Sequence, residues 1–255
     1  MREVLPGFDF DDTVVMGSTP MYNYCHQKGF ESIGIHLYDS AIRDYTEARW
    51  GSTHDYHIRY ILTNFPDLIP DKKYDLEELI TRASDVYMSN LENVFAKSVR
   101  PLEGTAAELG KLTVRPILAT GVHPDILPVV LKNAGIDQDF FDPIVTAYDI
   151  PQELSKPHPY MLHKAIKLRR KKYGESFELS DLVYVGDSKN DMRMAYSVGA
   201  TAIAVCTGRM SRVEIESSQK SYGGIIDYMK EDVLEVPDLI NSIRETRSAT
   251  PTVSR

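Results

Sequence analysis

Cysteine and long apolar runs are scarce in this chain of 255 residues, and positive charge is in deficit. The two cysteines, Cys25 and Cys206, lie far apart and lack the spacing of a metal site, which favours reduced thiols over a disulfide framework. No apolar run is long enough to span a bilayer. The first residues also lack the pattern of a signal peptide. We therefore expect a cytoplasmic protein that does not enter membranes.

The charge balance is acidic, with 29 lysines and arginines against 37 aspartates and glutamates, a net charge of −8. This balance argues against nucleic acid or an anionic membrane surface as a partner. An acidic protein can still bind a phosphate group where a metal ion and a few local donors reverse the field. The sequence leaves the oligomeric state open between monomer and dimer.

Strand-like and helix-like segments alternate after Pro101. This order predicts an α/β fold, with a parallel sheet covered by helices on both faces and a site at the carboxyl ends of its strands. The predicted strands are 114–119, 144–147, 182–185 and 202–205, with a short one at 223–226. The predicted helices are 104–112, 123–134, 159–172, 190–198 and 236–243.

The segment from Met16 to about Val99 has a different character, because apolar residues recur there at steps of three and four. The clearest examples are Tyr56–Asn64 and Leu76–Phe95. We expect about four helices here, inserted between the first strand and the rest of the sheet.

Asp9 and Asp11 stand two residues apart at the end of the first apolar run. Clustered carboxylates repel each other unless a cation or a shared proton relieves them, and Mg²⁺ is the usual cation for such a site. The alternative is a strand end followed by an acidic turn.

Three later motifs decide between these interpretations. Thr120-Gly121 ends a second apolar run, Lys156 precedes a predicted helix, and Asp187 and Asp191 follow a third apolar run. With Asp9 and Asp11, these motifs resemble, in order, those of the haloacid dehalogenase-like hydrolase superfamily. The layout is similar to its phosphoglycolate phosphatase-like branch.

The resemblance implies a Rossmann-like core over residues 1–16 and 101–246, an all-helical cap over 17–100 and a flexible tail over 247–255. Gly17-Ser18 and Arg100-Pro101 would then be hinges of a mobile cap. A fixed helical subdomain is the alternative. The first strand would be central, where Pro6 is awkward, so we expect the regular strand to start only at Phe8 or to follow a bulge.

The resemblance also implies a role for each motif residue. Asp9 is the expected nucleophile that forms an aspartyl-phosphate, and Asp11 the acid and base for the leaving group and the water. Thr120, the Gly121 amide and Lys156 would bind the phosphoryl oxygens.

The Asp9 side chain, the Asp11 backbone carbonyl and Asp187 would hold Mg²⁺. Asp191 would orient Lys156 or a metal-bound water. Asp12 departs from the family, which usually has glycine there, so its side chain has to point away from the phosphate.

Several cap residues lie where they could face a substrate, but we expect most to be surface or cap-core residues. They are Arg49, Trp50, His54, His57 and Arg59. His123 and His158 flank motif residues, and either could simply start a helix.

These patterns predict a Mg²⁺-dependent phosphatase acting on a small phosphorylated metabolite. A phosphomutase similar to β-phosphoglucomutase uses the same pair of aspartates and is the first rival. A non-catalytic protein that binds a phosphate ligand is the second.

Overall fold

The computed structural model describes residues 3–46, 49–70, 73–221 and 225–249. Its centre is a sheet of six strands in the order β3-β2-β1-β4-β5-β6, with every neighbouring pair parallel. The strands are β1 (Leu5–Phe8), β2 (Ile117–Thr120), β3 (Ile144–Thr146), β4 (Leu182–Gly186), β5 (Thr201–Val205) and β6 (Tyr228–Lys230). The predicted α/β fold with a Rossmann-like parallel sheet is confirmed.

Helices cover both faces of this sheet, because both faces of its strands are apolar. In β4, Leu182 and Tyr184 belong to one buried cluster, and Val183 and Val185 belong to the other. This alternation follows from the two-residue period of a strand. The Tyr184 face packs against α8 (Tyr160–Tyr173), α9 (Lys189–Ser197) and α10 (Arg212–Ser221). The Val185 face packs against α6 (Thr105–Leu109), α7 (Leu127–Asn133) and α11 (Val236–Ala249).

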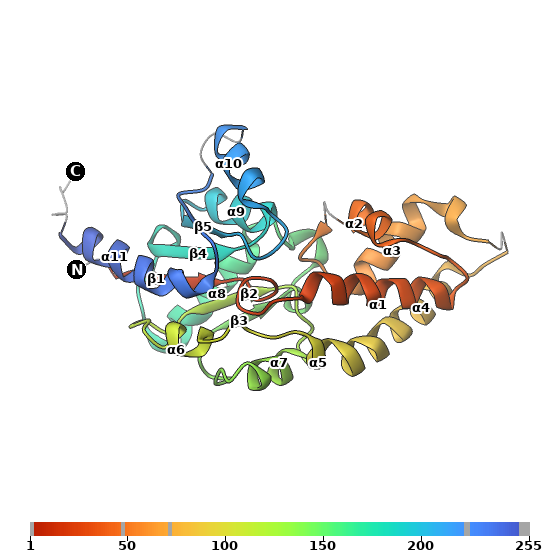
Figure 1. Cartoon of the computed structure of the whole chain (residues 1–255), viewed down its shortest axis with the longest axis horizontal. Coiled ribbons are helices and arrows are strands. Elements are labelled where there is room, and N and C mark those ends of the chain that lie inside the picture. The colour runs from red at the N-terminus through yellow and green to blue at the C-terminus, as the bar shows by residue number, and fades with distance from the viewer. Residues whose placement is uncertain (1–2, 47–48, 71–72, 222–224, 250–255) are drawn as a thin grey trace.

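A group of helices stands beyond one end of the sheet, at the right of Figure 1. It comprises α1 (Ser18–Ser32), α2 (Asp39–Thr46), α3 (His54–Asn64) and α4 (Leu76–Asn90). The Asp75 carboxylate accepts hydrogen bonds from the first backbone amides of α4, which fixes where this helix begins. The helix continues through a π-helical turn, Leu91–Phe95, into the short α5 (Ala96–Ser98). The helices predicted at 56–64 and 76–95 are confirmed.

The two chain segments that lead into and out of this helical group lie side by side. Met16 and Arg100 exchange backbone hydrogen bonds of 2.6 and 3.2 Å, forming an isolated antiparallel bridge. Gly17 follows with a φ of 88°, a left-handed conformation that glycine adopts without strain. The division into core and cap at these points stays a prediction.

Three sequence-based expectations need correction. Strand β1 starts at Leu5, and Pro6 is paired with Val183 of β4. Pairing with β2 begins only at Gly7, so Pro6 has a paired neighbour on one side alone, which is where a sheet tolerates proline. The last strand lies at Tyr228–Lys230 instead of 223–226; Gly223 and Gly224 are outside the described residues.

The C-terminal helix is longer than predicted. It runs to Ala249, so residues 247–249 are helical and do not belong to a tail. The rest of the predicted tail, 250–255, is outside the described residues.

Both cysteines are free thiols, with Cys25 buried and Cys206 partly buried. Among the described residues, no helix combines the length and the apolar character that a bilayer crossing requires.

Candidate active site

The predicted site residues gather at the carboxyl ends of the strands. Asp9 follows β1 directly, and its backbone amide still donates to Val185 of β4 at 2.8 Å. Asp187 follows the last residue of β4, and Thr120 is the last residue of β2. Because these strands are parallel neighbours, residues that are more than one hundred positions apart in the sequence meet at one edge of the sheet.

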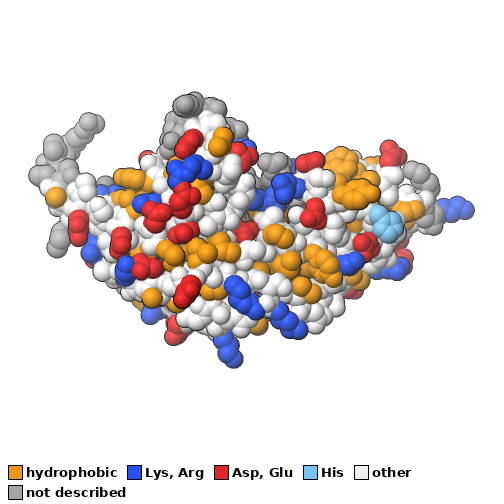
Figure 2. Space-filling model, in the orientation of Figure 1, with side chains coloured by type: hydrophobic (Ala, Val, Ile, Leu, Met, Phe, Trp, Pro, Cys, Tyr) orange, Lys and Arg blue, Asp and Glu red, His pale blue; other side chains and the backbone are white. Residues whose placement is uncertain are grey.

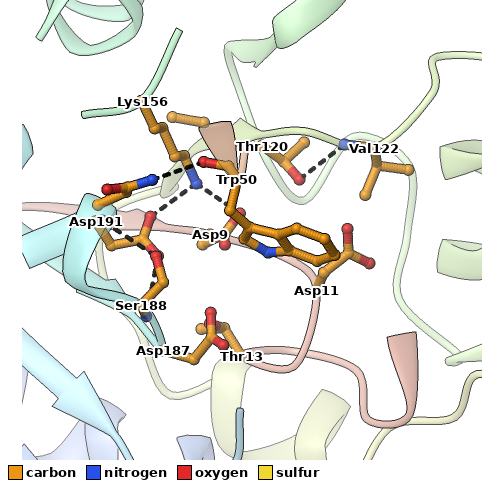
Figure 3. A network of polar contacts seen from close by, with 12 residues as sticks. Asp9, Asp11, Thr13, Trp50, Thr120, Val122, Lys156, Asp187, Ser188 and Asp191 are labelled. Carbon is orange, nitrogen blue, oxygen red and sulfur yellow. Dashed lines mark hydrogen bonds and ion pairs between the residues drawn. The ribbon is translucent and has the colours of Figure 1, made fainter. Parts of the chain in front are cut away.

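Lys156 connects two of the carboxylates. Its Nζ atom lies 2.8 Å from Asp9 Oδ1 and 2.8 Å from Asp191 Oδ1, and its side chain is only 2% exposed (Figure 3). Burial alone would lower the pKa of Lys156, but the charges of Asp191 and Asp9 raise it well above its ordinary value. A buried cation therefore sits between two buried acids.

Asp191 is held in place by the start of α9. Its second carboxylate oxygen, Oδ2, accepts from the Ser188 hydroxyl at 2.5 Å and from the Ser188 amide at 3.2 Å, in a capping box. A Cβ atom at Gly186 would come within 2.5 Å of Asp191 Cβ, so only glycine lets the two approach this closely. Both Asp191 oxygens are therefore engaged within the chain, Oδ1 with Lys156 and Oδ2 with Ser188.

The residues present fit a divalent cation. Carboxylate oxygens of Asp9, Asp187 and Asp191, all buried, lie within 4.8 Å of one another. Burial raises the pKa of Asp9 to about 6, and burial together with the charge of Asp191 raises that of Asp187 well above its ordinary range. A metal ion would relieve this unfavourable concentration of acids. Since Asp191 is already engaged, Asp9 and Asp187 are the two side chains best placed to hold it.

Asp11 lies in the same cavity but faces the helical group. Its Oδ2 atom accepts from the Tyr22 hydroxyl of α1 at 2.8 Å, and its Oδ1 atom is buried without a hydrogen bond to any described residue. Burial, and next the charge of Asp9, raise the pKa of Asp11 to about 8. Asp11 is therefore a carboxyl group that can hold or release a proton near neutral pH.

Asp12 points away from the other acids, as its charge requires. Its carboxylate accepts from the backbone amides of Gly17, Ser18 and Thr19 at 2.8 to 2.9 Å and from the Thr19 hydroxyl at 2.6 Å. These bonds satisfy free amides at the start of α1. Asp12 adopts a φ of 52°, in the left-handed region that aspartate tolerates better than most residues. The departure from the usual glycine thus serves the start of α1.

The two residues of the Thr120-Gly121 motif make different contacts. The Thr120 hydroxyl is buried and accepts from the Val122 amide at 3.2 Å, so its proton remains available for donation. Gly121 lines the cavity, with Gly51 directly over it. A Cβ atom on Gly121 would lie 3.3 Å from Gly51 Cα, and one on Gly51 would lie 3.0 Å from Lys156 Cβ. The loop before α3 therefore closes tightly over the site.

These residues enclose a cavity of about 40 Å³ whose far wall is aromatic. That wall consists of Tyr22, His26, Trp50, His54, His57, Tyr87, His123 and Tyr148. Trp50, His54 and His57 therefore line the cavity, and their contact with a substrate stays a prediction. His123 lines the cavity too.

The other flagged residues lie elsewhere. The Arg49 guanidinium stacks over Tyr60, Arg59 forms an exposed ion pair with Glu77, and His158 is exposed. Sequence reasoning missed Tyr22, His26, Tyr87 and Tyr148. Residues 22 and 26 on α1, and residues 54 and 57 on α3, are spaced to share a helix face, which is the signal that could have found them.

Direct contacts tie the helical group to the sheet. The Gln152 side-chain oxygen accepts from the amide and the hydroxyl of Thr53, both at 2.9 Å. The Asn190 side chain donates to the Trp50 carbonyl at 3.0 Å, and the Arg209 guanidinium stacks on the Trp50 ring at 3.3 Å. A groove of about 400 Å³ lies outside this contact. Three basic and two acidic residues line this groove: Lys189, Arg193, Arg209, Asp44 and Glu214. Figure 2 shows a notch between the upper lobe, which carries α10, and the helical group at the right, with side chains of both charges beside it.

Comparisons with known proteins agree with this geometry. The family model of haloacid dehalogenase-like hydrolases matches residues 7–199. No curated protein sequence matches significantly. Among solved structures, a predicted phosphoglycolate phosphatase from Haemophilus somnus superposes with a TM-score of 0.72 at 18% identity, over 94% of this chain and 98% of that one.

Two further structures are similar. A hydrolase from Pseudomonas syringae gives a TM-score of 0.70 at 19% identity, over 94% of this chain and 99% of the other. A putative β-phosphoglucomutase from Bacteroides vulgatus gives 0.68 at 17% identity, over 96% and 91%. At these identities the structures establish a shared fold, whereas the family match spans most of the chain. The predicted resemblance is confirmed: the chain belongs to the haloacid dehalogenase-like hydrolases.

Proposed function

We propose that this protein is a Mg²⁺-dependent phosphatase that hydrolyses a small phosphorylated metabolite through an aspartyl-phosphate on Asp9. The observation that carries the proposal is the Lys156 bridge: a buried cation 2.8 Å from both Asp9 and Asp191, beside Asp187. This arrangement holds a nucleophilic carboxylate next to positive charge in a largely buried site, where electrostatic stabilisation of phosphoryl transfer is strong.

In the first half of the reaction, an Asp9 carboxylate oxygen attacks phosphorus while the bond to the leaving oxygen breaks. Asp11, held by Tyr22 at 2.8 Å, gives its proton to that oxygen. Lys156, the Gly121 amide and the Thr120 hydroxyl bind the phosphoryl oxygens.

In the second half, a water molecule attacks the phosphorus of the aspartyl-phosphate. Asp11 takes the proton of the water, the bond between phosphorus and Asp9 breaks, and inorganic phosphate leaves. Bound by Asp9 and Asp187, with the Asp11 carbonyl as the expected third protein ligand, Mg²⁺ would neutralise charge on the phosphoryl oxygens.

Opening of the helical group is part of this proposal. A cavity of about 40 Å³ holds water but not a phosphate ester, since ligand pockets commonly measure about 300 Å³ or more. Residues 17–100 are then a mobile cap, and Gly17 and the Met16–Arg100 bridge are its hinge.

The decisive experiment measures phosphate release from an aryl phosphate with Mg²⁺ and with EDTA. We expect metal-dependent hydrolysis that Asp9→Asn abolishes. Asp238→Asn is the matched control, since that side chain is 71% exposed and far from the motifs in sequence. A folded wild-type protein that releases no phosphate from any ester would refute the phosphatase.

The mutase alternative makes a distinct prediction. A phosphomutase would return the phosphoryl group to a sugar phosphate, so isomerised product would exceed free phosphate. For the cellular setting, we propose the cytoplasm and a free metabolite as substrate, because a closing cap leaves little room for a macromolecule.

A further inference from the structure

Two histidines in the cavity wall have fixed hydrogen-bonding roles. His26 Nδ1 lies 2.9 Å from the Tyr22 carbonyl, and His57 Nε2 lies 2.9 Å from the Arg49 carbonyl. A carbonyl oxygen only accepts, so each of these nitrogens carries the proton. In a neutral imidazole the other nitrogen is then an acceptor.

The two acceptor nitrogens have no hydrogen-bond partner among the described residues. His26 Nε2 and His57 Nδ1 are both buried, in residues that are only 2% and 5% exposed. Their rings lie 5.5 Å apart between centroids, and both line the cavity next to Asp11. Buried polar atoms without partners are rare in folded proteins. We therefore expect a molecule that binds here to donate hydrogen bonds to these two nitrogens.

The rings remain neutral at physiological pH. Burial lowers the pKa of His26 to about 3 and that of His57 to about 4. Neither ring therefore becomes a cation that could attract a carboxylate.

The lysine and arginine side chains among the described residues of the cavity lining also offer no free positive charge that could attract a carboxylate on the leaving group. Among its lining residues in the described part of the chain, Lys156 alone has a lysine or arginine side chain, and Asp9 and Asp191 already engage it. Arg209 lines the outer groove and stacks on the far side of Trp50, from where its charge contributes to the lowered pKa of both histidines. A carboxylate placed against His26 Nε2 and His57 Nδ1 would face two acceptor atoms, which cannot replace the hydrogen bonds that it loses from water.

We propose that His26 and His57 form a leaving-group subsite that selects phosphate esters whose leaving group donates hydrogen bonds, through hydroxyls or an ammonium, and rejects those that carry a carboxylate. The proposal rests on the phosphatase function above and narrows its substrate class. Once the helical group has opened to admit the ester, the phosphoryl group binds at the Asp9 and Lys156 end of the site, and the remainder of the ester lies against the histidines.

The test compares esters that differ in one group. Glycerol phosphate ends in a hydroxymethyl group, whereas phosphoglycerate ends in a carboxylate at the same position. Propyl phosphate has the same carbon chain as glycerol phosphate but lacks its two free hydroxyls. We expect kcat/KM for glycerol phosphate to exceed that for propyl phosphate by about fivefold for each hydrogen bond formed, with phosphoglycerate the poorest. Aminoethyl phosphate tells an ammonium donor from a hydroxyl donor.

Variants locate the effect at the two rings. In His57→Phe and His26→Phe the ring remains but the acceptor is lost, so the ratio of glycerol phosphate to propyl phosphate should collapse toward one. His36→Gln is the matched control, because His36 is an exposed histidine of the same helical region. If the two histidines had only a structural role, their replacement would lower kcat/KM for both esters equally and leave the ratio unchanged.

The outcomes separate the two proposals. If the folded wild type releases phosphate from none of these esters, the aryl phosphate included, the phosphatase proposal fails. If phosphate is released but phosphoglycerate is preferred, or propyl phosphate matches glycerol phosphate in the wild type, the subsite proposal alone is refuted. Equal rates for propyl phosphate and glycerol phosphate would mean that water donates to the two nitrogens in the complex. Comparison of esters on the wild type decides this even if a variant does not fold.

Discussion

Replacement of Lys156 by methionine should destabilise the fold as well as abolish activity. Lys156 is 2% exposed in its side chain and balances Asp9 and Asp191, whose side chains are 11% and 0% exposed. Removal of one partner of a buried ion pair leaves an uncompensated charge, at a cost of about 3–5 kcal/mol. Two acids share this lysine, so we expect the upper part of that range.

The free energy of unfolding is measured by urea denaturation at pH 7 in EDTA, so that bound metal does not mask the loss. Lys172→Met is the control: Lys172 also pairs with an aspartate, Asp142, at 2.6 Å, but on the surface, where ion pairs contribute little.

Two further measurements examine the cause. Asp191→Asn added to Lys156→Met should recover part of the loss, because one unpaired charge disappears; coupling of about 1–3 kcal/mol is typical of such contacts. The loss should also shrink as the pH falls toward 6, because burial raises the pKa of Asp9 and the charge of Lys156 lowers it again. The variant without this lysine therefore protonates the buried carboxyl group at a higher pH than the wild type does. If Lys156→Met unfolds no more readily than Lys172→Met, the account of a charge-balanced site is wrong.

Three further predictions concern the cavity wall and the closed loop. Tyr22→Phe removes the hydrogen bond to Asp11 and should lower kcat by about tenfold with little change in KM. A change in KM as large as the change in kcat would contradict the role of Tyr22 in positioning Asp11. His57 has a folded pKa of about 4 against an ordinary 6.5, so the unfolded state binds its proton first and stability falls as the pH drops from 6.5 to 4. Relative to His57→Phe, the wild type should lose about 3 kcal/mol across that window, measured by urea denaturation; parallel curves for the two proteins would refute the buried neutral ring. Gly51→Val forces a side chain into a φ of 98° and against Lys156, and it should reduce kcat/KM without loss of the sheet's circular dichroism; unchanged kinetics would mean that the loop does not close over the site.

The order of strands and helices could be read from the sequence because each element has its own hydrophobic period. The helix at 76–90 begins where Asp75 caps it, and β4 is a continuous apolar run because both its faces are buried. Pro6 misled the prediction because the one-sided pairing of β1 at that residue depends on where β2 begins, which no local pattern records.

The motif residues could likewise be predicted, whereas their partners could not. Asp9 and Lys156 stand in recognisable motifs, but Tyr22 is an ordinary helical tyrosine until the fold brings it to Asp11. The tautomers of His26 and His57 depend on backbone carbonyls several residues away. Such roles arise from tertiary contacts, so they follow only from the structure.

The most direct test of the central claim is to trap the phosphoryl group on Asp9. Asp11→Asn can neither protonate a leaving group nor activate water, but an aryl phosphate leaves without protonation, so the first step should proceed and the second should stall. Incubated with Mg²⁺ and an aryl phosphate, this variant should accumulate one phosphoryl group on the peptide that contains Asp9, detected by mass spectrometry at low pH. Phosphate release without a labelled protein, or a label on another residue, would contradict the account.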